Sequence, residues 1–208
     1  VPNSNTFINK SKNYSENKQI KDVPYYINSN KIWEISLLPH GSRKIQKFLA
    51  NDLASKEDIN EIFSQLLYDL PSVCLNTYGS YVLEKIMDLL DGNQISKFID
   101  CIQYSFLKIS IDEVGNRIMQ KLITLASINK NYEIITYLAS SVIEALCKNK
   151  FGEFVIQKVL ETFPNNDFIF KFVYYNFHNL ISDCYGLLIV KKIIEMMKHK
   201  PKEFKISY

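Results

Sequence analysis

The side chains best suited to metal binding and nucleophilic catalysis are few in this sequence and lie far apart. The chain has three histidines and four cysteines, and no two cysteines form a C-x-x-C pair. A zinc site needs ligands at short spacing, so we expect no metal site. Four scattered cysteines are typical of free thiols in a reducing compartment rather than of a disulfide framework. We interpret all four as buried structural thiols: Cys74, Cys101, Cys147 and Cys184.

Sequence motifs of common enzyme active sites are also missing. The chain contains no G-x-S-x-G, no H-E-x-x-H, no P-loop and no G-x-G-x-x-G. Its carboxylates are spread at helical spacing, as on any solvated helix. We therefore expect neither an enzyme nor a cofactor. No run of 18 apolar residues indicates a membrane span, and the first residues lack the apolar core of a signal peptide.

Polar side chains that recur four residues apart offer a different chemistry. In a helix, residues i and i+4 lie side by side on one face. A glutamine amide offers a donor and an acceptor, whereas a carboxylate only accepts, so such pairs favour hydrogen bonding over catalysis. Pairs with this spacing include Ser42 with Gln46, Ser80 with Glu84, Asn116 with Gln120, and Glu153 with Gln157.

Glycines define the elements that must position these pairs. Five of the six glycines open the same short segment, at gaps of 38, 36, 37 and 34 residues. Such a recurrence indicates a stack of structural repeats. The remaining glycine, Gly92, follows Asp91, and this dipeptide suits a turn between helices. The five repeated glycines are Gly41, Gly79, Gly115, Gly152 and Gly186.

Apolar residues follow each of the five glycines in the same frame. Positions +4, +7 and +8, counted from the glycine, are apolar in every repeat, and position +6 is always lysine. Spacings of three and four residues place the apolar positions on one face of an amphipathic helix. Four of the five residues at position −5 are small, which favours a tight helix–helix contact. Further helical stretches lie between, near residues 58–70, 94–104, 131–146 and 167–177.

The five glycine segments resemble the second helix of the Pumilio (PUF) repeat. They read HGSRKIQKFL, YGSYVLEKIM, VGNRIMQKLI, FGEFVIQKVL and YGLLIVKKII. The resemblance covers about residues 28–200. It implies an all-α, right-handed α-solenoid, a superhelical crescent of about five three-helix repeats. Residues 1–27 would form a flexible arm or cap, followed by repeats near 28–65, 66–103, 104–140, 141–175 and 176–208.

The resemblance also implies that the second helices bind single-stranded RNA on the concave face, one base per repeat. Positions +1 and +5 would meet the edge of a base, and position +2 would stack between bases. In repeats one to three the implied bases are adenine, guanine and uracil. The residues at positions +1, +2 and +5 are Ser42, Arg43 and Gln46, then Ser80, Tyr81 and Glu84, then Asn116, Arg117 and Gln120.

The last two repeats depart from the family pattern. Repeat four presents Glu153, Phe154 and Gln157; its phenylalanine could stack, but glutamate at position +1 specifies no base that the pattern decodes. Repeat five has Leu187, Leu188 and Lys191, and so has no polar pair. We expect it to make at most a phosphate contact, or to serve as a cap or partner surface.

Composition neither demands nor excludes this function, because the net charge is only +3. In this family the RNA runs antiparallel to the protein chain, so the expected core site is 5′-UGA-3′. We expect a monomeric cytoplasmic regulator of messenger RNA, with possible protein effectors on the convex face and no membrane partner. The alternatives are a nucleolar protein that binds ribosomal RNA precursors with loose specificity, and a helical scaffold for protein interactions.

Overall fold

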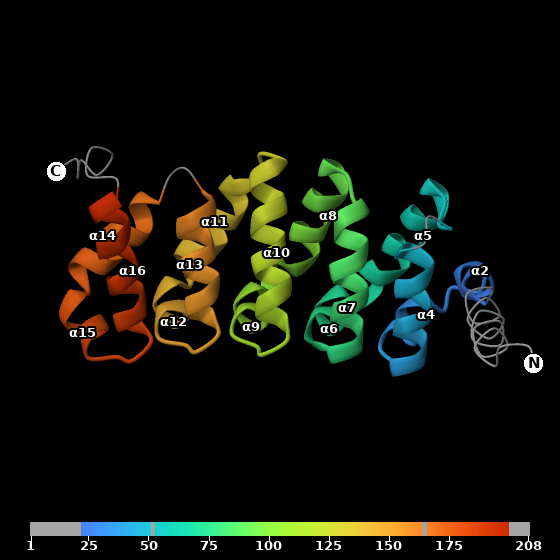
Figure 1. Ribbon diagram of the computed structural model, residues 1–208, viewed down its shortest axis with the longest axis horizontal. Coiled ribbons are helices and arrows are strands. Elements are labelled where there is room, and N and C mark those ends of the chain that lie inside the picture. Colours follow the sequence, from blue (N-terminus) through green and yellow to red (C-terminus); the bar gives the residue numbers. More distant parts are fainter. Residues whose placement is uncertain (1–21, 51–52, 164–165, 200–208) are drawn as a thin grey trace, which may run out of the picture. The chain divides into compact units, whose positions relative to one another are not determined.

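The computed structural model describes residues 22–50, 53–163 and 166–199 (Figure 1). Over these residues the chain is built of helices and short 3-10 turns without any strand, which confirms the expected all-α class. None of the described helices is both long and apolar enough to cross a membrane. The chain divides into two compact units, one ending at Asp91 and the other beginning at Gly92.

The first unit holds the helices of repeats one and two. Each repeat has a first helix, a short second one and a third that carries the repeated glycine. The helices are α2 (Val23–Asn28), α3 (Ile32–Ser36), α4 (Pro39–Ala50), α5 (Lys56–Leu66), α6 (Leu70–Leu75) and α7 (Thr77–Ile86). Short 3-10 turns, Leu67–Asp69 and Met87–Leu89, follow α5 and α7.

The second unit holds three repeats of the same plan. A 3-10 turn, Gln103–Ser105, links its first two helices. The helices are α8 (Gly92–Ile102), α9 (Phe106–Ser110), α10 (Gly115–Ile128), α11 (Tyr132–Ser141), α12 (Ile143–Cys147), α13 (Gly152–Thr162), α14 (Asp167–Tyr175), α15 (Phe177–Ile181) and α16 (Gly186–His199).

Helix α2 changes the expected start of the repeats. The boundary anticipated between residues 27 and 28 falls inside α2, which packs against α4 and α5. Its Val23 and Ile27 are buried, so residues 23–28 form the first helix of repeat one and not an arm. Residues 1–21, the rest of the anticipated arm, lie outside the described residues.

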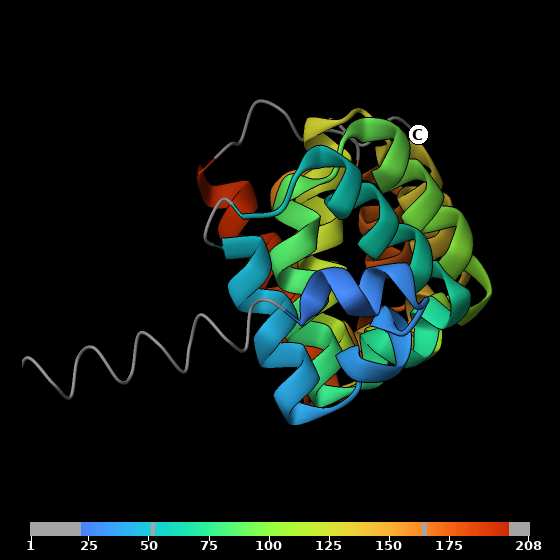
Figure 2. The ribbon, with the colours of Figure 1, turned by 90° about the vertical axis from the view of Figure 1, so that its right-hand side faces the viewer.

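The helices that carry the repeated glycines stack on one another within each unit. We call them the glycine helices: α4, α7, α10, α13 and α16. In the first unit α4 packs against α7, and in the second α13 packs against both α10 and α16 (Figures 1 and 2). Every glycine helix also packs against the short helix that precedes it, as α9 does on α10 and α12 on α13. Within each unit, this arrangement places the helices that carry the polar pairs next to each other.

The expected apolar frame forms the core of both units. Every residue at positions +4 and +7 is buried, and so are four of the five at position +8. The exception is Ile194, which is 45% exposed, because no described helix follows α16 to cover it. The small residues at position −5 are buried too, whereas their counterpart in the last repeat, Ile181, is exposed.

The repeated glycines are required by close helix contact and not by backbone conformation. No glycine has a positive φ. A Cβ atom built on Gly115 would lie 2.5 Å from the carbonyl oxygen of Ile109, and one on Gly152 would lie 2.7 Å from that of Leu146. At every repeated glycine the nearest atoms belong to the residue six positions earlier, on the short preceding helix. Any larger side chain would force the two helices apart.

The same hydrogen-bond pattern caps the start of four glycine helices. A side-chain oxygen three residues before the glycine accepts hydrogen bonds from the backbone N–H groups of the glycine and of the residue before it, at 2.7–3.0 Å. These bonds satisfy N–H groups that have no partner inside the helix. Repeat one has Leu38 at this position. The capping residues are Asn76, Asp112, Asn149 and Asp183.

The cysteines do not all follow the expectation of buried thiols. Cys74 and Cys147 are buried, as expected, and burial raises the pKa of the Cys147 thiol to about 12. Cys101 and Cys184 are exposed, so the prediction was wrong for both. Cys101 lies on the side of α8 away from its buried residues, and Cys184 lies in the loop between α15 and α16.

We expect Gly115→Ala to lower the free energy of unfolding by about 1–3 kcal/mol, the usual cost of overpacking. Denaturant unfolding followed by circular dichroism measures the change. Gly92→Ala is the matched control, because the nearest atom to its new Cβ would be the side-chain oxygen of Asn129 at 3.1 Å. Its effect should stay within about 0.5 kcal/mol. Equal stabilities of the two variants would contradict the close-contact explanation.

We expect a thiol reagent added to the native protein to modify Cys101 and Cys184 promptly, because thiolate formation and access control the reaction. Cys74 and Cys147 should react only after unfolding. Peptide mass spectrometry at successive times measures the order of modification. Cys101→Ser and Cys184→Ser should each remove one fast-reacting thiol, and fast labelling of Cys74 in the native protein would contradict the described burial.

Candidate nucleic-acid interface

The predicted base-contacting residues lie at three depths on the glycine helices α4, α7, α10 and α13. Position +1 is buried in all four, with at most 5% exposure. Position +5 is half-buried, and position +2 is exposed in every case. The exposed flat groups at position +2 are Arg43, Tyr81, Arg117 and Phe154.

Hydrogen bonds join positions +5 and +1 in three of the repeats. The Nε2 group of Gln46 donates to Ser42 Oγ at 2.8 Å, and that of Gln120 donates to Asn116 Oδ1 at 3.0 Å. In repeat four Gln157 Nε2 donates to Glu153 Oε2. The structure therefore brings these three predicted pairs together, and in each the buried residue accepts a hydrogen bond from the glutamine.

The serine hydroxyls at position +1 are also used within the protein. Ser42 Oγ donates to the backbone carbonyl of Tyr78, at the start of α7, at 2.6 Å. Because Ser42 also accepts from Gln46, it ties α4 to its neighbour and orients the glutamine at once. Ser80 Oγ donates to the carbonyl of Thr77 in its own helix, at 2.9 Å.

Asn116 is more fully engaged than the sequence suggested. Its Nδ2 group donates to the backbone carbonyls of Asp112 and Glu113, both at 2.8 Å. An amide nitrogen has two N–H groups, so both are used. The family resemblance predicts that both amides of repeat three meet a base edge. In the structure Gln120 carries the outward-facing amide, and Asn116 supports it from below.

Glu153 takes the place of Asn116 in repeat four. Its carboxylate is buried and accepts from Gln157, as the Asn116 carbonyl accepts from Gln120. Burial raises the pKa of Glu153, although the hydrogen bond from Gln157 opposes the shift. Repeat four thus keeps the geometry of the other pairs despite its unusual residue.

Repeat five has no comparable site, as its sequence indicated. Leu187 is half-buried, while Leu188 and Lys191 are exposed on α16. The lysine at position +6 of this repeat, Lys192, forms an ion pair with Glu161 of α13. Within the described ranges no three histidine, cysteine or carboxylate side chains gather closely enough to hold a metal ion.

Sequence comparison identifies the repeats. A family model described as "Pumilio-family RNA binding repeat" matches residues 70–102, 105–136 and 143–169. These segments contain helices α6 to α10, α12 and α13, together with the first half of α11, and so include three of the glycine helices.

Curated relatives carry the same family name. The chain is 24% identical to Pumilio homolog 12 of Arabidopsis thaliana over 182 residues, which is 85% of this chain and 30% of that protein. It is 25% identical to the mRNA-binding protein PUF2 of Saccharomyces cerevisiae over 157 residues, or 74% of this chain and 14% of that one. The chain therefore spans less than a third of the length of these two relatives.

Solved structures show the same fold. The Puf4 RNA binding domain, bound to an HO endonuclease RNA 3′ UTR recognition sequence, matches with a TM-score of 0.77 at 18% identity, over 91% of this chain and 62% of that one. The Puf3 RNA binding domain bound to a Cox17 RNA 3′ UTR site matches with a TM-score of 0.69 at 25% identity, over 82% and 49%. These matches confirm the expected α-solenoid class.

The two comparisons therefore agree: the sequence matches the Pumilio repeat, and the fold matches that of solved Puf domains. In sequence and in fold the chain is similar to Pumilio-family proteins, and its residues 70–102, 105–136 and 143–169 match the repeat of that family.

Proposed function

We propose that the chain binds single-stranded RNA through positions +1, +2 and +5 of its glycine helices, one base per repeat, and performs no catalysis. The observation that carries the proposal is the layering of these residues. A buried polar group holds a half-buried glutamine, and an exposed flat side chain lies beside it. The solved Puf3 and Puf4 domains, described as bound to RNA, support the assignment.

The glutamine amides have suitable groups for a base edge. With one N–H of Gln46 and Gln120 used on the residue below, each amide keeps one N–H and its carbonyl oxygen. Adenine and uracil each present a hydrogen-bond donor beside an acceptor, so the glutamine amide alone does not discriminate between the two bases. We propose that the residue at position +1 makes the choice, with Ser42 for adenine and Asn116 for uracil.

Repeat two presents a carboxylate in place of an amide. Glu84 is half-buried on α7, four residues after Ser80. A carboxylate only accepts hydrogen bonds, and guanine offers the neighbouring N1–H and N2–H donors. We propose that repeat two binds guanine, which makes 5′-UGA-3′ the core site when the strand runs antiparallel to the protein.

Stacking supplies the remaining affinity. Tyr81 and Phe154 are 39% and 45% exposed, so we propose that each ring stacks on a base. The guanidinium groups of Arg43 and Arg117 are also flat and exposed. Each base–aromatic stack contributes about 1–3 kcal/mol. Three or four such repeats suggest a dissociation constant of roughly micromolar order.

The biological setting is part of the proposal. The name of the yeast relative PUF2 and the 3′ UTR sequences bound by Puf3 and Puf4 favour messenger RNA as the partner. We propose a cytoplasmic monomer that regulates messenger RNA and contacts effector proteins on its convex face. Binding of ribosomal RNA precursors in the nucleolus is the alternative, favoured by the missing pair in repeat five.

A protein-interaction scaffold is a second candidate function. It is favoured by the apolar side chains that α16 exposes, among them Leu188 and Ile194. A scaffold would retain protein partners and give no cross-links to RNA in cells. RNA cross-linking of the full chain therefore separates the two functions.

We expect Ser80→Asn with Glu84→Gln to move the preference at the central base from guanine to uracil, because the carboxylate acceptor becomes a donor–acceptor amide. Fluorescence anisotropy with UGA and UUA oligonucleotides measures the change. The ratio of the two affinities should shift by about tenfold or more, which corresponds to about 1.4 kcal/mol. Preference for adenine at the next base serves as the internal control, and an unchanged central preference would refute base reading by repeat two.

We expect Glu153→Gln to stabilise the protein near pH 7 and to have little effect near pH 4. Because the folded-state pKa of Glu153 lies above its ordinary value of 4.5, ionisation lowers stability as pH rises through that folded pKa. Glutamine cannot ionise and still accepts from Gln157. Thermal unfolding at both pH values measures the difference. Glu133→Gln, on an exposed position of α11, makes the same charge change as a control, and equal pH profiles for the two variants would contradict the effect of burial.

A further inference from the structure

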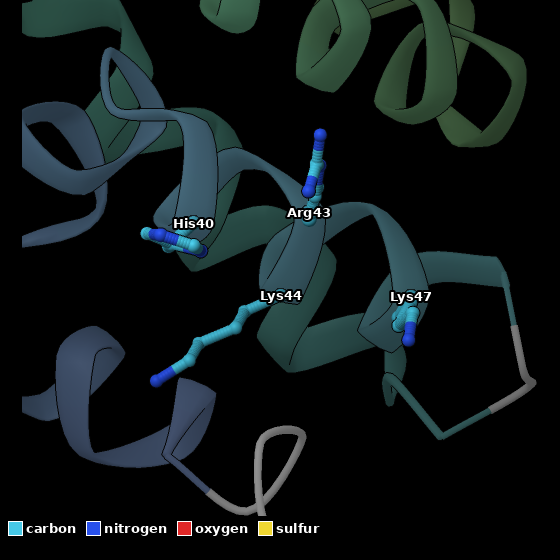
Figure 3. Close-up of a pocket in the computed structure, with 4 residues that line it drawn as sticks. All are labelled: His40, Arg43, Lys44 and Lys47. Carbon is cyan, nitrogen blue, oxygen red and sulfur yellow. The ribbon is translucent and has the colours of Figure 1, made fainter. Parts of the chain in front are cut away.

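One side of α4 carries four basic side chains, of which the base-reading proposal uses only Arg43. His40, Arg43, Lys44 and Lys47 line a surface hollow of about 490 Å³ (Figure 3). Spacings of three, four and seven residues place all four on one side of the helix. We call this set the α4 basic face.

The α4 basic face lies away from the neighbouring glycine helix. Ser42 points toward α7, since it donates to the carbonyl of Tyr78. Lys44 extends instead toward α2, where it pairs with Asp22 at 2.8 Å and lies 5.8 Å from the ring centre of Tyr26 (Figure 3). The basic face therefore borders the end of the repeat-one site that lies opposite repeat two.

Among the glycine helices of repeats one to four, α4 carries the most basic side chains. Its three lysine and arginine side chains have no carboxylate on the same helix. Helix α10 carries two basic side chains, Arg117 and Lys121, and no carboxylate. Helix α7 carries Glu84 beside Lys85, and α13 carries Glu153 and Glu161 beside Lys158. Helix α4 by itself therefore carries a charge of about +3, part of which Asp22 offsets through its ion pair with Lys44.

We propose that the α4 basic face binds phosphate groups of the RNA strand on the 3′ side of the base read by repeat one. This inference rests on the proposed function, which places adenine and then the 3′ end of the strand at α4. Arg43 joins the two sites, because it is the stacking residue of repeat one and also lines the hollow. Contacts to phosphate are independent of base identity, so the site extends the length of RNA bound without extending its sequence.

Asp22 modulates the same site. It accepts a hydrogen bond from Lys44, and this bond is the main reason that the pKa of Lys44 is raised. A phosphate that binds there competes with the Asp22 carboxylate for the lysine. Removing the carboxylate ends this competition, and Lys44 can then pair with the phosphate. Asp22→Asn should therefore strengthen binding of the 3′ extension.

The experiment compares a UGA oligonucleotide with the same oligonucleotide carrying three abasic nucleotides at its 3′ end, which add phosphates without bases. Affinities of the full chain are measured by anisotropy over a range of salt concentrations. The extended RNA should bind more tightly and with a steeper salt dependence, by about 0.7 in log–log slope for each phosphate contacted. An equal extension on the 5′ end is the matched RNA control.

Protein variants then locate the effect. Lys44→Gln with Lys47→Gln should abolish the gain from the 3′ extension and leave the preference for UGA over UUA unchanged. Lys97→Gln with Lys108→Gln removes the same charge from exposed positions on α8 and α9, and it should preserve the gain. Circular dichroism of both double variants checks that they are folded.

The outcomes separate this inference from the proposed function. UGA preference without any gain from the 3′ extension, or a gain that survives the α4 variant, overturns the phosphate site alone. A gain that depends on α4 without UGA preference supports the phosphate site and overturns base reading. Failure of every RNA to bind overturns both.

Discussion

The missing Cβ atom of the repeated glycine is the constraint on which the other contacts depend. It lets the start of each glycine helix lie against the backbone of the preceding short helix, with carbonyl oxygens such as those of Ile109 and Leu146 where a methyl group would otherwise sit. That contact determines how closely the whole glycine helix packs against the preceding short helix. It buries positions +4 and +7 in every repeat and brings position +1 beneath the surface. A polar residue at position +1 must then find its partners inside the protein.

Those internal partners explain how the candidate site is organised before any ligand arrives. Ser42 and Asn116 use their donors on backbone carbonyls, and their oxygens hold Gln46 and Gln120. A side chain held in one geometry loses less conformational entropy when it binds. The buried Glu153 keeps the same contact with Gln157 at the cost of a raised pKa, so repeat four preserves the arrangement with different electrostatics. The glutamines, and not the residues below them, face outward.

Electrostatics in this protein are local rather than global. The net charge of +3 says little about a polyanionic ligand, yet α4 carries only basic charged side chains and α13 carries acidic and basic ones together. Within the first unit, the polar pair of repeat one (Ser42 and Gln46) and the α4 basic face occupy adjoining sides of one helix. Base selection and phosphate attraction are thereby assigned to different residues, as expected when affinity and specificity have separate physical origins.

The sequence by itself determined the repeat, its helices, the buried apolar frame and the pairing of positions +1 and +5, because these follow from spacing along a helix. Only the tertiary structure decided what the surroundings of each position allow. Cys101 and Cys184 are exposed, Ile194 lacks a cover, and residues 23–28 join the first repeat, since each depends on which helix lies nearby. The bond from Ser42 to Tyr78 joins two repeats, and the carbonyls that occupy Asn116 depend on exact backbone geometry. Periodicity shows on which side of its own helix a residue lies. Burial and hydrogen bonding depend on which other helices pack against that side.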